Sequence, residues 1–325
     1  MKPAWAPAHA MAALLPLLLA AGGGWAQQGG AGSGPVGAVP AAAGPVPLWF
    51  DDFSYRQPAD LRAAGWTLRQ QAGHPGVPGA RWPATALSLL DDPAQAGNRL
   101  LRLTARTDGT AAGTEQAQLC HQRRALYGTY AARVRFTDAP LSGAGGDPVV
   151  QTVYAVSPLK HAFDPTFSEL DWEYLPQGGW GSPAQRLYAV AWQTVQLEPW
   201  VAHNGATEVP GAHGGWRQLT VQVSGDSAGG QSRWFVDGRE VAVHGGRNHP
   251  VQPMAISFSL WFSPTGLQPA SAQPRVWVQD VDWVLYSPQE QLSPAQAAAR
   301  VAAWRAQAVP RVDTLAAGVD AACDF

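Results

Sequence analysis

The sequence predicts an all-β protein built as a β-sandwich. Short stretches of alternating apolar and polar residues recur along the chain, separated by Gly, Pro, Asp and Asn, which is typical of strands joined by turns. No helical pattern of ten residues interrupts these stretches, so strands linked by helical crossovers are not indicated. The expected strands are Arg99–Ala105, Gln118–Leu126, Thr129–Phe136, Val149–Val156, Ser168–Leu175, Leu187–Val195, Arg217–Ser224, Arg233–Val236, Met254–Phe262 and Val276–Tyr286.

The composition of the 325 residues excludes several classes of function. Lys and Arg number 22 against 24 Asp and Glu, a net charge of −2, which leaves no basic surface for nucleic acid. The eight histidines and two cysteines lack the spacing of a metal site, so we expect no catalytic metal. Tryptophan, with 15 copies, outnumbers tyrosine and phenylalanine. Charge-poor, Trp-rich chains are typical of proteins that handle sugars, because indole rings stack on the apolar faces of sugars.

The N-terminal segments predict export. A positive start at Lys2, an apolar run at 10–21 and small residues around Trp25 indicate a signal peptide over residues 1–26. Residues 27–47 form a Gly/Ala/Pro-rich linker, residues 48–290 the folded domain, and residues 291–325 a C-terminal helix and tail. No later apolar run reaches about 18 residues, so no membrane span is expected in the mature chain. We expect a secreted or periplasmic protein.

An exported chain can form disulfides, and the only two cysteines are the candidates. A bond between Cys120 and Cys323 would tie the C-terminal tail to a strand. The alternative is two unrelated thiols, because Cys323 lies close to the end of the chain, where chains usually fray.

One helix is expected near the C-terminus. Ser293 is a good N-cap, Pro294 suits the first helical position, and Gln296 completes a capping box. Pro310 ends the pattern. The face expected to pack on the outside of the sandwich holds Val301, Trp304 and Ala308, and a partner-binding role for this helix is the alternative.

The most informative segment is the expected strand at 168–175. Glu169, Asp171 and Glu173 occupy every second position, so that in a strand they share one face. Three carboxylates in a row repel one another, and a purely structural strand has no reason to accept that cost. The alternate positions, which face the expected core, are Leu170, Trp172 and Tyr174.

The spacing of these carboxylates suits glycoside hydrolysis. A rise of about 3.3 Å per residue separates the Cα atoms of Glu169 and Glu173 by about 13 Å. Converging side chains could bring their carboxyl groups to about 5–6 Å, near the separation that retaining glycosidases use. Crowding also separates the pKa values of neighbouring acids, so one can stay protonated near neutral pH.

The segment Glu-Leu-Asp-Trp-Glu at 169–173 resembles the E-[IL]-D-x-E signature of glycoside hydrolase family 16. Other parts of the chain, between Trp49 and Tyr286, resemble family segments in the same order. They are Phe50–Phe53, Tyr127–Phe136, Trp234–Gly238 and Val281–Tyr286.

The resemblance implies a concanavalin-like jelly-roll sandwich and an endo-acting retaining hydrolase of β-linked polysaccharide. Glu169 would be the nucleophile, Glu173 the general acid/base, and Asp171 would tune the nucleophile. No cofactor would be required, although family members often hold a structural calcium between the first and last strands, for which Asp282 is the candidate. We expect a monomer. The β-1,3-, mixed-linkage, xyloglucan and galactan substrates of the family all remain open.

Sugar-binding candidates lie along the expected strands and the loops around the carboxylates. Each aromatic candidate could instead belong to the core, as we expect for Trp172 and Trp283. The aromatic candidates are Tyr154, Trp180, Trp192, Trp200 and Trp261, and the hydrogen-bonding candidates are His121 and Arg124.

Three other functions remain alternatives. A lectin-like protein would bind polysaccharide on the same fold without cutting it. A transglycosylase would pass the same intermediate to a sugar instead of water. A structural component of an exopolysaccharide export system would use the linker to reach partners.

Overall fold

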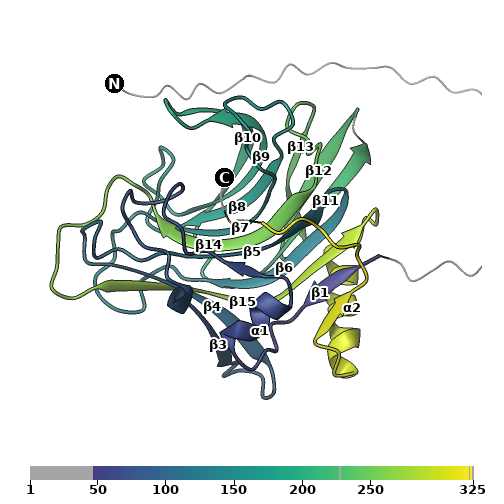
Figure 1. Cartoon of the computed structure of the whole chain (residues 1–325), viewed down its shortest axis with the longest axis horizontal. Helices are drawn as coiled ribbons and strands as arrows, with labels where there is room; N and C mark the ends of the chain where they lie inside the picture. The colour runs from purple at the N-terminus through teal and green to yellow at the C-terminus, as the bar shows by residue number, and fades with distance from the viewer. Residues whose placement is uncertain (1–46, 227, 322, 324–325) are drawn as a thin grey trace, which may run out of the picture. The chain divides into compact units, whose positions relative to one another are not determined.

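The computed structural model describes residues 47–226, 228–321 and 323 (Figure 1). The predicted signal peptide at 1–26 and all but the last residue of the linker lie outside the described residues. Two antiparallel sheets pack face to face, which confirms the predicted β-sandwich. No described helix is long and apolar enough to cross a membrane.

The first sheet has seven strands and carries the expected carboxylate strand near its middle. Every neighbouring pair is antiparallel. In spatial order the strands are β10 (Val201–Pro210), β9 (Arg186–Gln196), β8 (Glu169–Leu175), β7 (Val149–Val156), β14 (Met254–Phe262), β5 (Ala117–Ala125) and β2 (Thr67–Leu68).

The second sheet packs against one face of the first. Its main path runs β13 (Arg239–Gly245), β12 (Gly229–Val236), β11 (Gly215–Asp226), β6 (Gly128–Phe136), β15 (Arg275–Pro288), β1 (Trp49–Asp51) and β16 (Arg311–Asp313). A side branch adds β4 (Arg99–Thr107), which pairs with β15, and β3 (Leu87–Asp91). Outside the sheets lie a short helix α1 (Pro58–Ala63) and a single 3₁₀ turn at Ala84–Ala86.

The core between the sheets follows the period-two pattern of the strands. On β8, the side chains of Leu170, Trp172 and Tyr174 are buried in this core, as predicted. Trp172 meets Trp234 of β12 edge-to-face, with ring centroids 5.0 Å apart. This contact joins the two sheets directly behind the carboxylates and fixes which face of β8 points away from the core.

Helix α2 (Pro294–Ala306) confirms the predicted C-terminal helix. The hydroxyl of Ser293 accepts from the backbone N–H of Gln296, and the Gln296 side chain completes the capping box. Val301 packs on the outer face of the second sheet, together with Trp304. The prediction was wrong for Ala308, because the helix ends at Ala306 and Ala308 adopts a left-handed backbone conformation in solvent.

Trp283 is buried as predicted, although not between the sheets. It lies under α2 in the outer apolar layer, with Phe50 and Leu285. A shift in the β6–β15 register between Val281 and Trp283 accounts for this, because a one-residue bulge turns the following side chains to the other face.

Asp282 does not fit the role of a calcium ligand. Its carboxylate is buried and already held by Arg133 at 2.5 Å and Arg305 at 2.8 Å, and it accepts a third bond from Asn98 at 2.9 Å. Within the described part of the chain, no three His, Cys, Asp or Glu side chains form a group that could hold a metal ion. The guanidinium groups of Arg133 and Arg305 thus provide the positive charge that a calcium ion would provide next to Asp282.

We expect Arg305→Leu to destabilise the fold by about 2 kcal/mol, because it leaves a buried carboxylate with half of its compensating charge. Urea unfolding would measure this, with Arg239→Leu, an exposed arginine on β13, as the control expected to stay within about 0.5 kcal/mol. Added calcium should not restore the variant. Unchanged stability, or rescue by calcium, would contradict this assignment.

Candidate active site

The side chains of Glu169, Asp171 and Glu173 project from β8 on the side facing away from the second sheet. This side of the seven-stranded sheet is called the carboxylate face below. By strand register Asp171 lies opposite Tyr154 of β7, and Glu173 opposite Tyr188 of β9. The sheet thus sets the three acids in a row between aromatic neighbours.

Two of the acids are deeply buried for charged groups, and Glu173 is partly exposed. Glu169 is 4% and Asp171 5% exposed. The apolar side chains packed around them form a second cluster, separate from the core between the sheets, which includes Val190, Trp192 and Trp261. Such surroundings disfavour the charged form of a carboxylic acid.

Two indole N–H groups donate hydrogen bonds to this row. Trp192 donates to Asp171 Oδ2 at 2.5 Å, and Trp180 donates to Glu173 Oε2 at 3.0 Å. Glu169 Oε2 is buried and has no hydrogen-bond partner in the described part of the chain. A buried acceptor without a donor calls for an explanation, and a role in chemistry provides one.

Burial shifts the titration of all three acids. It raises the pKa of Glu173 to about 7, and the Trp180 N–H limits this rise. Burial and repulsion from Asp171 and Glu173 raise the pKa of Glu169 well above its usual value. The pKa of Asp171 is raised too, by burial and then by Glu173. Near neutral pH the row therefore retains protons, as acid–base catalysis requires.

The loop that carries Trp180 is built to reach Glu173. Trp180 has a positive φ of 48° and sits between Gly179 and Gly181. A left-handed conformation costs a bulky residue about 1–2 kcal/mol, while glycine adopts it freely. The hydrogen bond to Glu173 is the contact that this strained position secures.

The five aromatic candidates all lie around the carboxylates. Trp180 and Trp192 touch them directly, and Tyr154 is the cross-strand neighbour of Asp171. Trp261 lies 6.1 Å from Trp180, and Trp200 lies 6.1 Å from Trp192, measured between ring centroids. Trp200 is 52% exposed, and its ring stacks on His74, with the ring centroids 5.5 Å apart.

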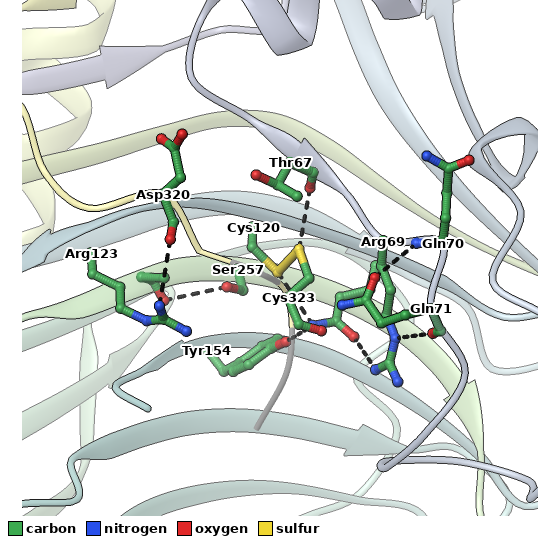
Figure 2. Close-up of a disulfide and its surroundings, with 12 residues drawn as sticks. Thr67, Arg69, Gln70, Gln71, Cys120, Arg123, Tyr154, Ser257, Asp320 and Cys323 are labelled. Atoms are coloured by element: carbon green, nitrogen blue, oxygen red, sulfur yellow. Dashed lines mark hydrogen bonds between the residues drawn. A yellow bond between two sulfur atoms is a disulfide. The ribbon is translucent and has the colours of Figure 1, made fainter. Parts of the chain in front are cut away.

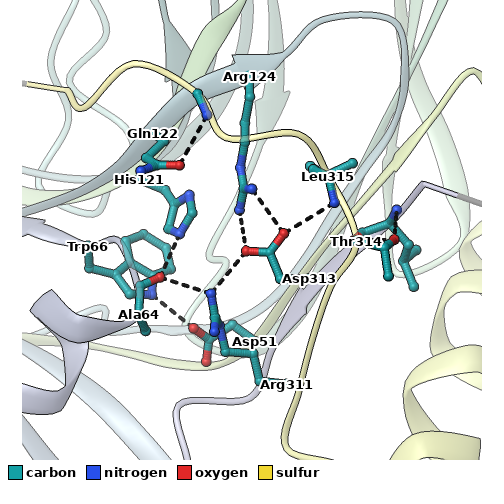
Figure 3. A network of polar contacts seen from close by, with 12 residues as sticks. Asp51, Ala64, Trp66, His121, Gln122, Arg124, Arg311, Asp313, Thr314 and Leu315 are labelled. Atoms are coloured by element: carbon teal, nitrogen blue, oxygen red, sulfur yellow. Dashed lines mark hydrogen bonds and ion pairs between the residues drawn. The ribbon is translucent and has the colours of Figure 1, made fainter.

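The predictions for His121 and Arg124 were wrong. His121 is buried between Trp49 and Trp66, where one ring nitrogen contacts the carbonyl of Ala64 (Figure 3). Burial lowers the pKa of His121 to about 3. Arg124 forms a two-bond ion pair with Asp313, at 2.7 and 2.9 Å. Both side chains stabilise the fold and the C-terminal segment, and neither reaches the carboxylate face.

Sequence reasoning missed the groups that extend the site beyond Tyr154. The amide of Gln118 on β5 donates to the Tyr154 hydroxyl at 2.6 Å and accepts from Arg69 at 2.7 Å. Arg69 in turn lies 3.9 Å above the ring of Trp82. Period-two alternation with Cys120 could have placed Gln118 on this face, whereas Arg69 and Trp82 lie in a loop without periodicity.

Cys120 and Cys323 are joined by a disulfide, with Cα atoms 5.6 Å apart (Figure 2). The bond links β5 to the C-terminal segment across 203 residues of sequence. Of the two alternatives that the sequence left open, the structure has the bonded pair.

Comparisons with known proteins show the fold. No family model matches the chain, and no curated protein matches its sequence. Solved structures do match: a Bacillus licheniformis β-glucanase has 13% identity and a TM-score of 0.52, covering 75% of this chain and 99% of its own. A glycoside hydrolase family 16 endo-glucanase from Bacteroides ovatus has 14% identity and a TM-score of 0.52, with 72% and 98% coverage. LamA from Zobellia galactanivorans, in complex with laminaritriose and laminaritetraose, has 13% identity and a TM-score of 0.50, with 73% and 97% coverage.

These neighbours confirm the predicted fold. The chain has the concanavalin-like jelly roll of glycoside hydrolase family 16 enzymes, and α2 is the predicted C-terminal helix.

We expect Glu173→Gln to stabilise the protein at pH 8 but not at pH 4. The folded-state pKa of Glu173 is about 7 against 4.5 in a free chain, so stability falls as pH rises through this interval. Above pH 7 the ionised side chain costs roughly 2–3 kcal/mol, which the neutral amide avoids. Urea unfolding at both pH values would measure the difference. The exposed Glu198→Gln is the control, and an equal effect at pH 4 and pH 8 would refute the prediction.

Proposed function

We propose that this protein is an exported, endo-acting retaining hydrolase of β-linked polysaccharide. The observation that carries the proposal is the row of Glu169, Asp171 and Glu173 on one strand face, with the first two buried and the last two bonded by indole N–H groups. A sandwich shared with a β-glucanase and an endo-glucanase supports it. Among these neighbours, LamA is in complex with laminaritriose and laminaritetraose, so a β-glucan is the first substrate class to test.

In this mechanism Glu173 begins protonated, as a pKa of about 7 allows. It donates its proton to the glycosidic oxygen while Glu169 attacks the anomeric carbon, and the bond to the leaving sugar breaks. A glycosyl–enzyme ester results. Glu173, now a carboxylate, takes a proton from water, which attacks the anomeric carbon and releases Glu169. Two inversions at that carbon retain the anomeric configuration.

Asp171 acts as a positioning residue for the nucleophile. Burial and the charge of Asp171 raise the pKa of Glu169, and burial raises the pKa of Asp171, so we place a retained proton on one or the other carboxyl group. Glu169 reacts as a carboxylate when that proton lies on Asp171. The Trp192 N–H fixes the Asp171 side chain from the opposite strand, which keeps the pair in register through the reaction.

The aromatic side chains around the row would bind the glycan. Trp200 is the most exposed of them and would stack on a sugar ring, while Trp180 and Trp192 combine stacking with their bonds to the acids. The protein would work as a monomer and would need no cofactor. Interception of the glycosyl–enzyme ester by a sugar instead of water would make the same site a transglycosylase.

Substrates with different leaving groups distinguish the roles of Glu169 and Glu173. We expect Glu169→Gln to lose activity on all substrates by at least about 10³-fold, because no nucleophile remains. Glu173→Gln should lose a similar factor on polysaccharide but still release a first equivalent of phenolate from aryl glycosides, because phenolate leaves without protonation. Further turnover should be slow, because hydrolysis of the glycosyl–enzyme ester lacks its base. Reducing-end assays on laminarin, lichenan, xyloglucan, agarose, carrageenan and chitosan, beside an aryl β-glucoside, would measure both.

The same assays decide between enzyme and binding protein. Retention of the anomeric configuration, followed by NMR, would establish the double displacement. Unchanged hydrolysis in Glu169→Gln would refute the proposed nucleophile. Glycan binding by folded wild-type protein, without new reducing ends from any polymer, would favour a lectin-like role.

We expect Trp180→Phe to move the basic limb of the kcat/KM profile to higher pH, by up to about one unit. The indole N–H lowers the pKa of Glu173, so its removal leaves the acid protonated to higher pH. Trp200→Phe is the matched control, because it should change KM and leave the limb in place. A profile that stays fixed in Trp180→Phe would show that the hydrogen bond does not tune the acid.

A further inference from the structure

The C-terminal segment follows β5 after it leaves the second sheet. Residues 314–321 and Cys323 are called the tail below. The carbonyl of Val319 accepts from the backbone N–H of Arg123 at 2.7 Å, and the side chain of Asp320 accepts from Gln122 at 2.9 Å. These bonds place the tail alongside the edge of the sheet that holds the carboxylates.

The tail then ends on the carboxylate face itself. By strand register Cys120, Ser257, Tyr154 and Asp171 form one line across β5, β14, β7 and β8. The disulfide lies over the β5 end of this line (Figure 2), three strand spacings or about 14 Å from the Asp171 position. Cys323 is only 2% exposed, so it is packed onto the sheet.

The packing of the tail is apolar and close. Ala321 and Cys323 form a buried cluster with Cys120 and Ala255 of the sheet. Such contacts exclude any other ligand from the face positions of β5 and from the neighbouring end of β14.

One side chain connects the tail to the aromatic residue beside the acids. The amide nitrogen of Gln118 lies 3.3 Å from the carbonyl oxygen of Cys323 and 2.6 Å from the hydroxyl of Tyr154. The tail therefore reaches to within one side chain of the cross-strand neighbour of Asp171. A sugar chain that extends from the carboxylates toward β5 would contact the tail after passing only Tyr154 and Gln118.

The opposite side of the row carries aromatic rings that are partly exposed. Beyond β8, Trp192 contacts Asp171, and Trp200 follows at the connection between β9 and β10 with half of its surface exposed. Toward β10 the face is aromatic and partly exposed, with His74 stacked on Trp200, whereas toward β5 the tail covers it.

From this asymmetry we infer that the disulfide-anchored tail closes the glycan groove on the β5 side and determines where the substrate is cut. The inference rests on the proposed hydrolase function. With the disulfide closed, the long arm of the glycan lies over β9 and β10, only a short arm extends past the carboxylates, and cleavage falls near a chain end. The endo action of the proposed function then belongs to the form without the disulfide. Without the disulfide, the tail can leave β5, and the groove accepts the interior of a polymer.

Full-length Cys323→Ser tests this inference, with Cys120→Ser as the second variant, because both release the tail without removing any residue. The readout is the loss of viscosity of a soluble β-glucan for each new reducing end. End-directed cleavage gives many reducing ends for little viscosity loss, and internal cleavage the reverse. We expect a several-fold larger viscosity loss per reducing end in both variants, with longer first products.

Dithiothreitol provides the matched control. It supplies the two electrons and two protons that convert the disulfide to two thiols, so it should move wild-type protein to the behaviour of Cys323→Ser. It should leave Cys323→Ser itself unchanged. Circular dichroism and thermal melting check that each form is folded.

Each outcome bears on the inference. An unchanged ratio in folded variants, with activity that Glu169→Gln abolishes, would overturn the tail's role while the proposed function stands. Loss of activity in folded variants would overturn it too, since the tail would then support the site. Activity that appears only after release of the tail would support the inference. Inactivity of wild type and variants on every glycan would refute the hydrolase function and the inference together.

Discussion

The crowding of three carboxyl groups on one face of β8, two of them buried, is the constraint on which the rest of the site depends. Removing a charged carboxylate from water is costly, and three in a row add mutual repulsion. The structure limits this cost with two indole hydrogen bonds, and the pKa of Glu173 rises to about 7. The strand can hold such a row because its other face is anchored in the core through Trp172. Packing between the two sheets therefore holds the carboxylates in place, although their burial and mutual repulsion destabilise the fold.

A comparison with the buried aspartates of the second sheet separates structural acids from functional ones. Asp280 is held by Arg102 at 2.7 Å and Arg135 at 2.6 Å, and Asp282 is likewise held by two arginines. The arginines compensate the negative charges of these aspartates, and the ion pairs join β15 to β4, β6 and α2. Among the described residues, no arginine or lysine pairs with the carboxylates of β8. These carboxylates are surrounded by aromatic rings instead. The same residue type is thus stabilised as an anion in one sheet and kept partly protonated in the other. A carboxyl group whose pKa is raised by burial, with no cationic partner, is more typical of a functional site than of a structural one.

Much of the fold and the carboxylate row could be predicted from local sequence, because period-two alternation and helix capping act between near neighbours. The helix followed from the capping box of Ser293 and Gln296, with Pro294 at its start and Pro310 after its end. Alternation also held the information that was missed for His121, since Leu119 two positions earlier faces the core and His121 must share that side. Arg124 could not be placed in this way, because its partner Asp313 is 189 residues away. Asp282 was misjudged for the same reason: its arginines come from β6 and from α2, and only the folded chain brings them together.

The residue types on the carboxylate face support a one-sided groove independently of the tail. Next to Glu173 the cross-strand line toward β5 continues through Thr152 and Ser259 to Gln118. Thr152 and Ser259 are bonded to each other, at 2.5 Å between their hydroxyl oxygens, and the amide of Gln118 is used by Tyr154 and Arg69. No ring lies on this line for a sugar to stack on, and its polar groups have little hydrogen-bonding capacity left. Stacking on exposed aromatic rings supplies much of the free energy with which proteins hold sugars, so a glycan gains little by extending over these positions. The disulfide covers the neighbouring line at Cys120, so the tail and these polar positions together leave little surface for carbohydrate on the β5 side of the row. The partly exposed ring of Trp200 lies on the opposite side.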